Sequence, residues 1–186
     1  MLTRADLLDA SNEERLRLLR TGHPIDPSRL DDLEYRGVSL GLPAFVERLT
    51  WTTFQKVFHR DPGTGLLRGW NVRVEQRGLD AESVPQQRGG EPFTFGHFLV
   101  ATLDPERTPR GIKKGLLLDY GRGGNPRGDV TAFVRDPIVA VNEGSADLLL
   151  GWTYVHLAGM DFGTPSFFSL ERERPITHVA AVPRPG

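Results

Sequence analysis

The sequence predicts a mainly β protein, an antiparallel barrel of about eight or nine strands with N-terminal helices packed on it. After residue 65 the chain is a series of short apolar runs joined by turns rich in glycine, proline and aspartate. Parallel strands need crossovers of helical length, and none separates these runs, so antiparallel strands are expected. The stretch "DLLLGWTYVHLAG" (147–159) is apolar on both faces. In a closed barrel one face points inward, and a helical layer can cover part of the other.

The first third of the chain contains the expected helices. The segment "ADLLDASNEERLRLLRTG" (5–22) predicts one helix, in which Ser11 and Glu14 match a capping box. The segment "LPAFVERLTWTTFQKVFHRD" (42–61) predicts a second helix with Pro43 in its first turn. The β-branched residues in its second half are also compatible with a strand.

The expected strands are short runs of alternating or continuous apolar residues. They lie at 33–41, 66–76, 93–103, 112–120, 130–136, 137–142, 147–159, 166–173 and 176–182. Pro137 either separates two short strands or interrupts a single one. With 186 residues and no long linker, the chain is expected to form a single domain, 1–186. Within it, 1–30 is the helical segment and 31–186 is the barrel.

The composition excludes several classes of function. The 23 basic and 24 acidic side chains nearly cancel, which argues against a generic binder of nucleic acid or anionic membranes. The chain has no cysteine, so disulfides, thiol catalysis and thiolate metal sites are excluded. The N-terminal stretch lacks the apolar core of a signal peptide, and no run approaches the ~20 apolar residues of a membrane span. We therefore expect a cytoplasmic protein without a membrane span.

The strand alternation predicts a site inside the barrel. One parity of the strands combines apolar and aromatic side chains with a few polar tips, as small-molecule pockets do. We expect it to bind a small apolar or amphipathic molecule, lipid-like or polyketide-like. The expected ligand-binding residues are Trp70, Phe93, Phe95, His97, Leu118, Tyr120, Trp152, Tyr154 and His156. The same aromatic residues also suit a filled core, so both interpretations stay open.

Two other functions are compatible with the same fold. An enzyme acting on an apolar substrate would use Tyr120, Asp119 or His97 for proton transfer, because these residues lie on apolar runs where desolvation shifts pKa values. A partner-binding module without a small ligand, such as a homodimer, would use the outward parity. Its interface would include Leu149, Val155 and Leu157.

The five histidines do not show the spacing of a metal site. No metal and no cofactor is therefore expected. The alternative is a haem inside the barrel, with the imidazole of His97 or His156 on the iron.

Five segments resemble a family of uncharacterised bacterial lipocalin-like proteins whose N-terminal module carries a Gly-x-Trp-x-Gly pattern. They are "LEYRGVSLGLP", "LTWTTFQKVFHRD", "LLLDYGRGG", "RDPIVAVNEGSADLLLGWTY" and "FFSLERE". Here Tyr35 stands where the family has tryptophan, and residues 76–112 have no counterpart. The resemblance implies a small β-rich, lipocalin-like domain, and it implies no reaction and no functional residue.

Overall fold

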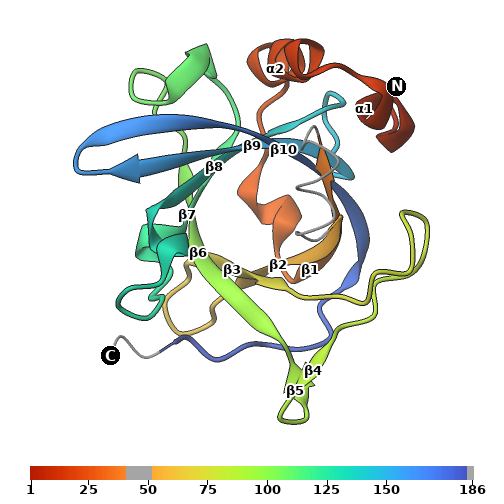
Figure 1. The fold of residues 1–186 in the computed structure, drawn as a ribbon, viewed down its shortest axis with the longest axis vertical. Coiled ribbons are helices and arrows are strands. Elements are labelled where there is room, and N and C mark those ends of the chain that lie inside the picture. Colours follow the sequence, from red (N-terminus) through yellow and green to blue (C-terminus); the bar gives the residue numbers. More distant parts are fainter. Residues whose placement is uncertain (41–51, 184–186) are drawn as a thin grey trace.

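A computed structural model describes residues 1–40 and 52–183. Within them the helical elements are α1 (Arg4–Asp9), α2 (Asn12–Thr21) and the 3-10 turns η1 (Pro27–Leu30), η2 (Pro109–Gly111), η3 (Tyr120–Arg122) and η4 (Val130–Phe133). The strands are β1 (Leu33–Leu40), β2 (Thr53–Arg60), β3 (Leu67–Val72), β4 (Gln87–Arg88), β5 (Glu91–Pro92), β6 (Thr94–Thr102), β7 (Leu116–Asp119), β8 (Val134–Ala140), β9 (Leu148–Leu157) and β10 (Met160–Pro175) (Figure 1).

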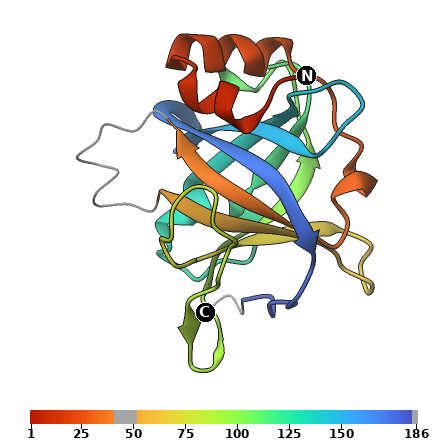
Figure 2. The ribbon, with the colours of Figure 1, turned by 90° about the vertical axis from the view of Figure 1, so that its right-hand side faces the viewer.

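Eight of these strands form a closed barrel in the order β1-β10-β9-β8-β7-β6-β3-β2. Every pair of neighbouring strands is antiparallel. The predicted fold class is therefore confirmed. Strands β4 and β5 form a separate small hairpin that projects away from the barrel (Figure 2). No helix of the described residues is long and apolar enough to cross a membrane.

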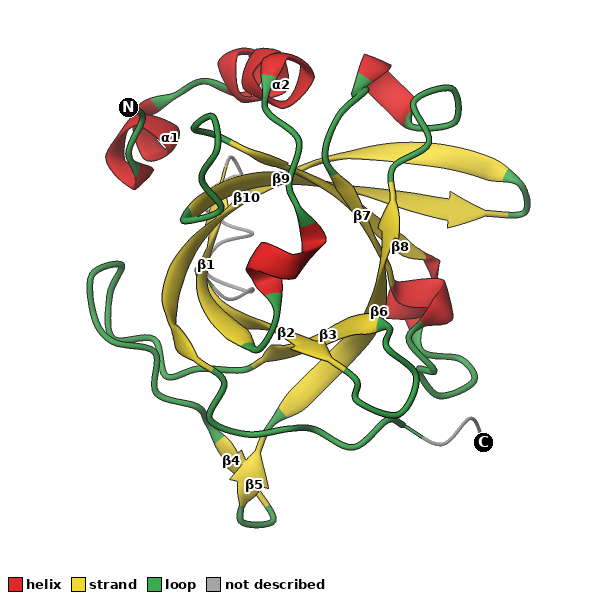
Figure 3. Ribbon diagram, turned by 180° about the vertical axis from the view of Figure 1, so that it is seen from behind, coloured by secondary structure: helices red, strands yellow, loops and turns green. Residues whose placement is uncertain are grey.

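The barrel interior is one buried cluster to which every barrel strand contributes. Its members include Tyr35, Phe58, Leu67, Phe98, Leu118, Ile138, Leu149 and Leu170, one from each strand. Ile25 and Leu30, which precede β1, belong to the same cluster. Figure 3 shows η1 lying across the opening of the barrel. One end of the barrel is thus closed by the chain itself.

A second cluster lies between the outer face of the barrel and the N-terminal helices. It joins Leu7 of α1 and Leu19 of α2 to Leu150 and Trp152 of β9. The helices form a layer on that side of the barrel (Figure 2). Both faces of β9 are therefore covered, which explains its doubly apolar sequence. The face that carries Trp152 and Tyr154 belongs to this outer cluster and does not line the interior.

Several predicted elements need correction. Segment 5–22 forms two helices, because the side chain of Ser11 caps a new helix by accepting from the backbone N–H of Glu14. The second half of 42–61 is strand β2, in which every residue is buried or partly buried, as suits a strand covered on both sides. The first part of that predicted helix, 42–51, lies outside the described residues.

The C-terminal corrections follow from the closure of the barrel. Residues 130–142 contain one strand, β8, preceded by the turn η4. Segment 176–182 is not a strand, because a closed barrel leaves no free edge to pair with. It lies instead on the outer face, where Ile176 and Ala180 pack with Val57 and Trp70.

Candidate functional site

A charged cluster lies inside the barrel and centres on Lys56 of β2. The Lys56 side chain is 2% exposed and Asp136 of β8 is 4% exposed, and Lys56 Nζ lies 3.1 Å from Asp136 Oδ2. Lys56 Nζ also donates to Tyr120 Oη at 2.6 Å. Since β2 and β8 stand on opposite sides of the strand order, the lysine side chain crosses the interior.

The neighbours of this ion pair complete a hydrogen-bond network. Tyr120 Oη donates to Asp136 Oδ2 at 2.8 Å, and Thr153 Oγ1 donates to Asp136 Oδ1 at 2.8 Å. Asn71 Nδ2 donates to Tyr120 Oη at 3.4 Å and to the Gly96 carbonyl oxygen at 3.1 Å. The carboxylate therefore has partners on both oxygens, as a buried charge requires.

Lys56 retains one unused donor. An ammonium group has three N–H bonds, and two are accounted for by Tyr120 and Asp136. Among residues 1–40 and 52–183, the third meets aromatic rings rather than a hydrogen-bond acceptor. The Nζ atom lies 4.7 Å from the ring centroid of Phe168, 5.2 Å from Phe98 and 5.7 Å from Phe54. The rings stabilise the charge through cation–π attraction.

Glycines make room for this ring of phenylalanines. Each phenylalanine lies over a glycine directly opposite it on a neighbouring strand, and the pairs are Gly37 with Phe54, Gly69 with Phe98 and Gly151 with Phe168. A Cβ atom on these glycines would approach a ring carbon to 2.3, 2.4 and 2.1 Å, respectively. Such approaches are impossible without displacement. Gly37 of β1, Gly69 of β3 and Gly151 of β9 thus leave the space that the rings around Lys56 occupy.

Burial shifts the pKa values of Lys56 and Tyr120 in opposite directions. Desolvation lowers the pKa of Lys56, and the attraction of Asp136 opposes that change. Desolvation raises the pKa of Tyr120 well above its usual value, and the nearby charge of Asp136 raises it further. Tyr120 is therefore a neutral hydrogen-bond donor at physiological pH, and Lys56 is easier to deprotonate than a solvated lysine.

The cluster lies in the half of the barrel away from η1. Near the η1 end, Leu30 and Leu149 are fully buried. At the other end, Phe54, Val134 and Thr153 are partly exposed. The edge of the charged cluster at Thr153 is thus partly exposed at that end, as is Phe54, whose ring centroid lies 5.7 Å from Lys56 Nζ.

The structure brings two of the nine predicted ligand-binding residues into the interior, Leu118 and Tyr120. Trp152 and Tyr154 stack on the outer face of the barrel, in the cluster that also contains the helix leucines, with ring centroids 5.6 Å apart. His156 is exposed beyond them and its Nδ1 lies 2.7 Å from Asp161 Oδ1. The expectation that this parity of β9 faces inward is wrong. The inward face carries the small residues Gly151 and Thr153, which leave space for Phe168 and the lysine.

The remaining predicted residues also lie outside the interior cluster. Trp70 belongs to the outer cluster beneath the C-terminal segment, and the His97 ring lies 6.0 Å from it. Phe93 and Phe95 pack on each other with centroids 6.5 Å apart, and Arg73 lies 4.7 Å above Phe93. The structure therefore does not assemble the nine residues into one pocket.

The three predicted acid–base residues are separated in the same way. Tyr120 is inside the barrel, whereas Asp119 pairs with Arg135 at 3.0 Å on the other parity. His97 is 7% exposed, and burial, followed by the charge of Arg68, lowers its pKa to about 4. The two histidines considered for haem lie in different outer environments. Of the residues considered for a dimer interface, Leu149 is in the core and Leu157 is exposed.

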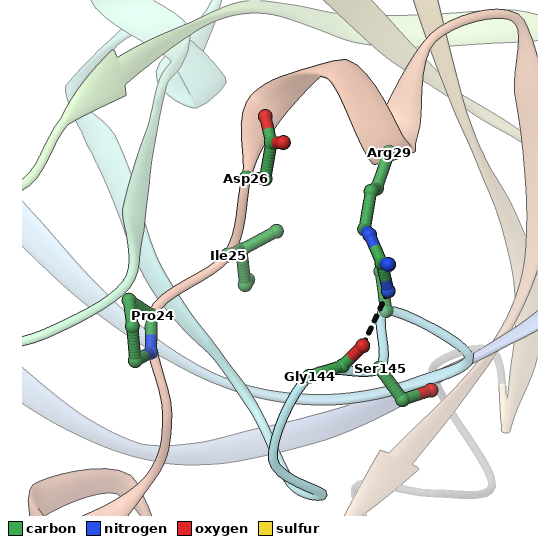
Figure 4. A pocket seen from close by; sticks show the side chains of 7 residues that line it. Pro24, Ile25, Asp26, Arg29, Gly144 and Ser145 are labelled. Atoms are coloured by element: carbon green, nitrogen blue, oxygen red, sulfur yellow. Dashed lines mark hydrogen bonds between the residues drawn. The ribbon is translucent and has the colours of Figure 1, made fainter.

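Surface pockets surround the barrel. Figure 4 shows one of about 420 Å³ at the η1 end, lined by Pro24, Ile25, Asp26, Arg29, Gly144, Ser145 and Ala146. Its polar side chains are engaged within the chain: Arg29 donates to the Gly144 carbonyl oxygen, and Asp26 accepts from Ser28. This pocket therefore offers a ligand few free polar groups.

A wider groove of about 600 Å³ lies on the outer face of β7, β8 and β9. It contains Tyr154, His156 and Asp161, so two predicted ligand-binding residues share a surface groove instead of the interior. Burial raises the pKa of Tyr154 to about 12. The polar side chains His156 and Asp161 contact each other at the surface, and exposed contacts of this kind contribute little energy.

The predicted site did not include Lys56, Asn71, Asp136 or Thr153. One signal for Lys56 exists in the sequence. Lysine occurs at positions 56, 113 and 114, and every other basic residue among the 23 is arginine. A lysine between Phe54 and Phe58 in an arginine-rich chain is therefore unusual. The expected helix over 42–61 concealed it, because a helix does not direct Lys56 into a barrel.

Comparison of the chain with protein-family models, curated proteins and solved structures finds no match. Within residues 1–40 and 52–183 no group of three or more histidine, aspartate and glutamate side chains is placed to hold a metal ion.

Proposed function

We propose that the protein binds a small, mainly apolar molecule carrying a carbonyl oxygen, with that oxygen accepting the unused N–H of Lys56. The observation that carries the proposal is this buried lysine, which spans the barrel and has a donor that meets only aromatic rings among the described residues. A buried ion pair contributes less stability than apolar packing of the same volume in many proteins. Its presence in the interior therefore favours a role beyond folding.

The charge balance favours a neutral acceptor over a carboxylate. Asp136 already neutralises Lys56, so a second anion would lie close to the Asp136 carboxylate in a medium of low dielectric constant. A ketone, aldehyde, ester or amide oxygen takes the free N–H without adding charge. The rings of Phe54, Phe98 and Phe168 supply the apolar contacts for the rest of the molecule.

The route of entry follows from the exposure of Phe54. Rotation of this partly exposed ring away from Gly37 would free the volume that the ring occupies beside Lys56. The other interior rings are fully buried or nearly so. Binding therefore proceeds from the end of the barrel opposite η1.

Isothermal titration calorimetry with methyl octyl ketone tests the proposal. The wild-type protein should bind, and the Lys56→Met/Asp136→Leu variant should bind about tenfold or more weakly, because a hydrogen bond from a charged donor is worth about 1.5–3 kcal/mol. Removing both charges avoids an unpaired carboxylate in the core. Lys114→Met is the matched control at an exposed lysine and should bind like wild type. Equal affinity of all three proteins would contradict the proposal.

A further inference from the structure

We infer that Lys56 captures apolar aldehydes covalently, forming an imine inside the barrel; this inference rests on the proposed binding of carbonyl compounds at the same site. The side chain has the surroundings of a reactive amine. Tyr120 Oη lies 2.6 Å from its nitrogen, Asp136 Oδ2 lies 3.1 Å away, and aromatic rings enclose the remaining side.

The choice of lysine over arginine supports a chemical role. Arginine stays protonated in proteins, whereas lysine loses its proton when buried and is then a nucleophile. The chain uses arginine at all but three of its 23 basic positions. The other two lysines, Lys113 and Lys114, are exposed. Of the three lysines, Lys56 is the one that is buried, and burial favours its uncharged amine.

The neighbouring groups allow each proton transfer of imine formation. Lys56 passes a proton to Asp136, and the free amine attacks the aldehyde carbon to form the C–N bond. The carbonyl oxygen takes the proton back through Asp136 or Tyr120, giving a hydroxyl group on that carbon. The nitrogen then passes one of its two protons through Asp136 to this hydroxyl group, the C–O bond breaks, and water leaves. The nitrogen lone pair forms the C=N bond, and the imine keeps the other proton. The overall change converts an ammonium and an aldehyde into a protonated imine and water, with no oxidation or reduction.

The product preserves the charge balance of the site. A protonated imine keeps the positive charge next to Asp136, so the buried carboxylate remains paired. The apolar surroundings exclude water, which slows hydrolysis of the imine. Methyl ketones meet the same contacts but react less readily with amines, so they serve as reversible competitors.

Reductive trapping tests the inference. Wild-type protein is incubated with decanal and sodium cyanoborohydride, and peptide mapping locates the added decyl group. We expect Lys56 to be modified ahead of the exposed Lys113 and Lys114, which act as comparators within the same molecule. Lys56→Arg keeps the positive charge beside Asp136 and should lose the label on this peptide while the labels on Lys113 and Lys114 persist.

A competition experiment on the wild type tests the inference without requiring that a variant folds. Methyl octyl ketone should slow labelling of Lys56 and leave labelling of Lys113 and Lys114 unchanged. Labelling confined to Lys113, Lys114 and the N-terminus would overturn the inference. If the ketone still binds in a Lys56-dependent manner in that case, the proposed function stands without the covalent step. If the ketone does not bind either, both proposals fail.

Discussion

At the scale of single residues, the buried charges of Lys56 and Asp136 decide the character of the interior. Each is paired with the other and with hydroxyl or aromatic groups, so neither charge is isolated in the apolar core. The desolvation cost of such a pair is large, and removal of one partner leaves the other uncompensated.

Replacing one member of the pair should therefore cost more than replacing both. We expect Lys56→Met to lower the free energy of unfolding by about 3–5 kcal/mol, because it leaves the Asp136 carboxylate buried without a cation. Lys56→Met/Asp136→Leu should be more stable than Lys56→Met alone. Urea denaturation of both single variants and the double variant gives the coupling energy, expected at about 2 kcal/mol. Additive losses would show that the two charges do not interact as the structure indicates.

His97 should make stability depend on pH. In the folded protein burial lowers its pKa from 6.5 to about 4, so the folded state binds no proton at His97 over that interval while the unfolded state does. Stability from this group is present above pH 6.5 and falls as the pH falls towards 4, by on the order of 3 kcal/mol. His97→Leu should lose less stability over the same interval. Urea denaturation at several pH values compares the two proteins, and equal pH slopes would exclude the proposed burial of His97.

At the scale of elements, large and small side chains face each other on neighbouring strands. Bulky rings on one strand occupy the space left by glycines on the next, as between Phe168 and Gly151. The narrow interior of an eight-stranded barrel requires this alternation of large and small side chains.

Adding one methyl group at an inward glycine should disturb this match. In Gly151→Ala the new Cβ would lie 2.1 Å from Phe168, so we expect a loss of about 1–3 kcal/mol in the free energy of unfolding. Gly63→Ala is the control, because its Cβ would meet only Asp61 Oδ1, at 3.4 Å. The control should change stability by less than about 0.5 kcal/mol. Thermal or urea denaturation of both variants measures the difference, and a neutral Gly151→Ala would argue against the close packing of Phe168 on this glycine.

The helical layer should contribute to stability through its buried leucines. Leu19 of α2 is fully buried between the helix and the outer face of the barrel. Leu19→Ala should therefore cost about 2–5 kcal/mol. Arg17→Ala on the exposed side of the same helix removes an ion pair with Glu14 and should cost less than about 1 kcal/mol. Comparable losses in the two variants, measured by urea denaturation, would mean that the layer is not packed on the barrel.

At the scale of the whole molecule, periodicity and turn chemistry were enough to predict an antiparallel barrel under a helical layer. They could not assign the faces of β9, because both of its parities are apolar and alternation alone does not say which points inward. The eight barrel strands form a closed sheet with no free edge, so the apolar segment 176–182 does not pair as a strand. It packs on the outer face of the barrel instead. Such closure is a property of the assembled sheet and not of any one segment.

The candidate site was predicted less well for a related reason. Tyr120 and Leu118 were correctly grouped with the interior, since β7 alternates clearly. Lys56 and Asp136 are 80 residues apart in the sequence and meet only because β2 and β8 oppose each other across the barrel. Contacts of this kind depend on strand order, which the local pattern does not encode.

A crystal structure of the protein with methyl octyl ketone would locate the carbonyl group and so decide whether Lys56 binds it. We predict that the ketone oxygen lies within hydrogen-bonding distance of Lys56 Nζ, that the alkyl chain contacts Phe98 and Phe168, and that the Phe54 ring has moved away from Gly37. A ketone bound instead in the outer groove beside Tyr154 and His156, with Lys56 still enclosed by its rings, would contradict the proposed site.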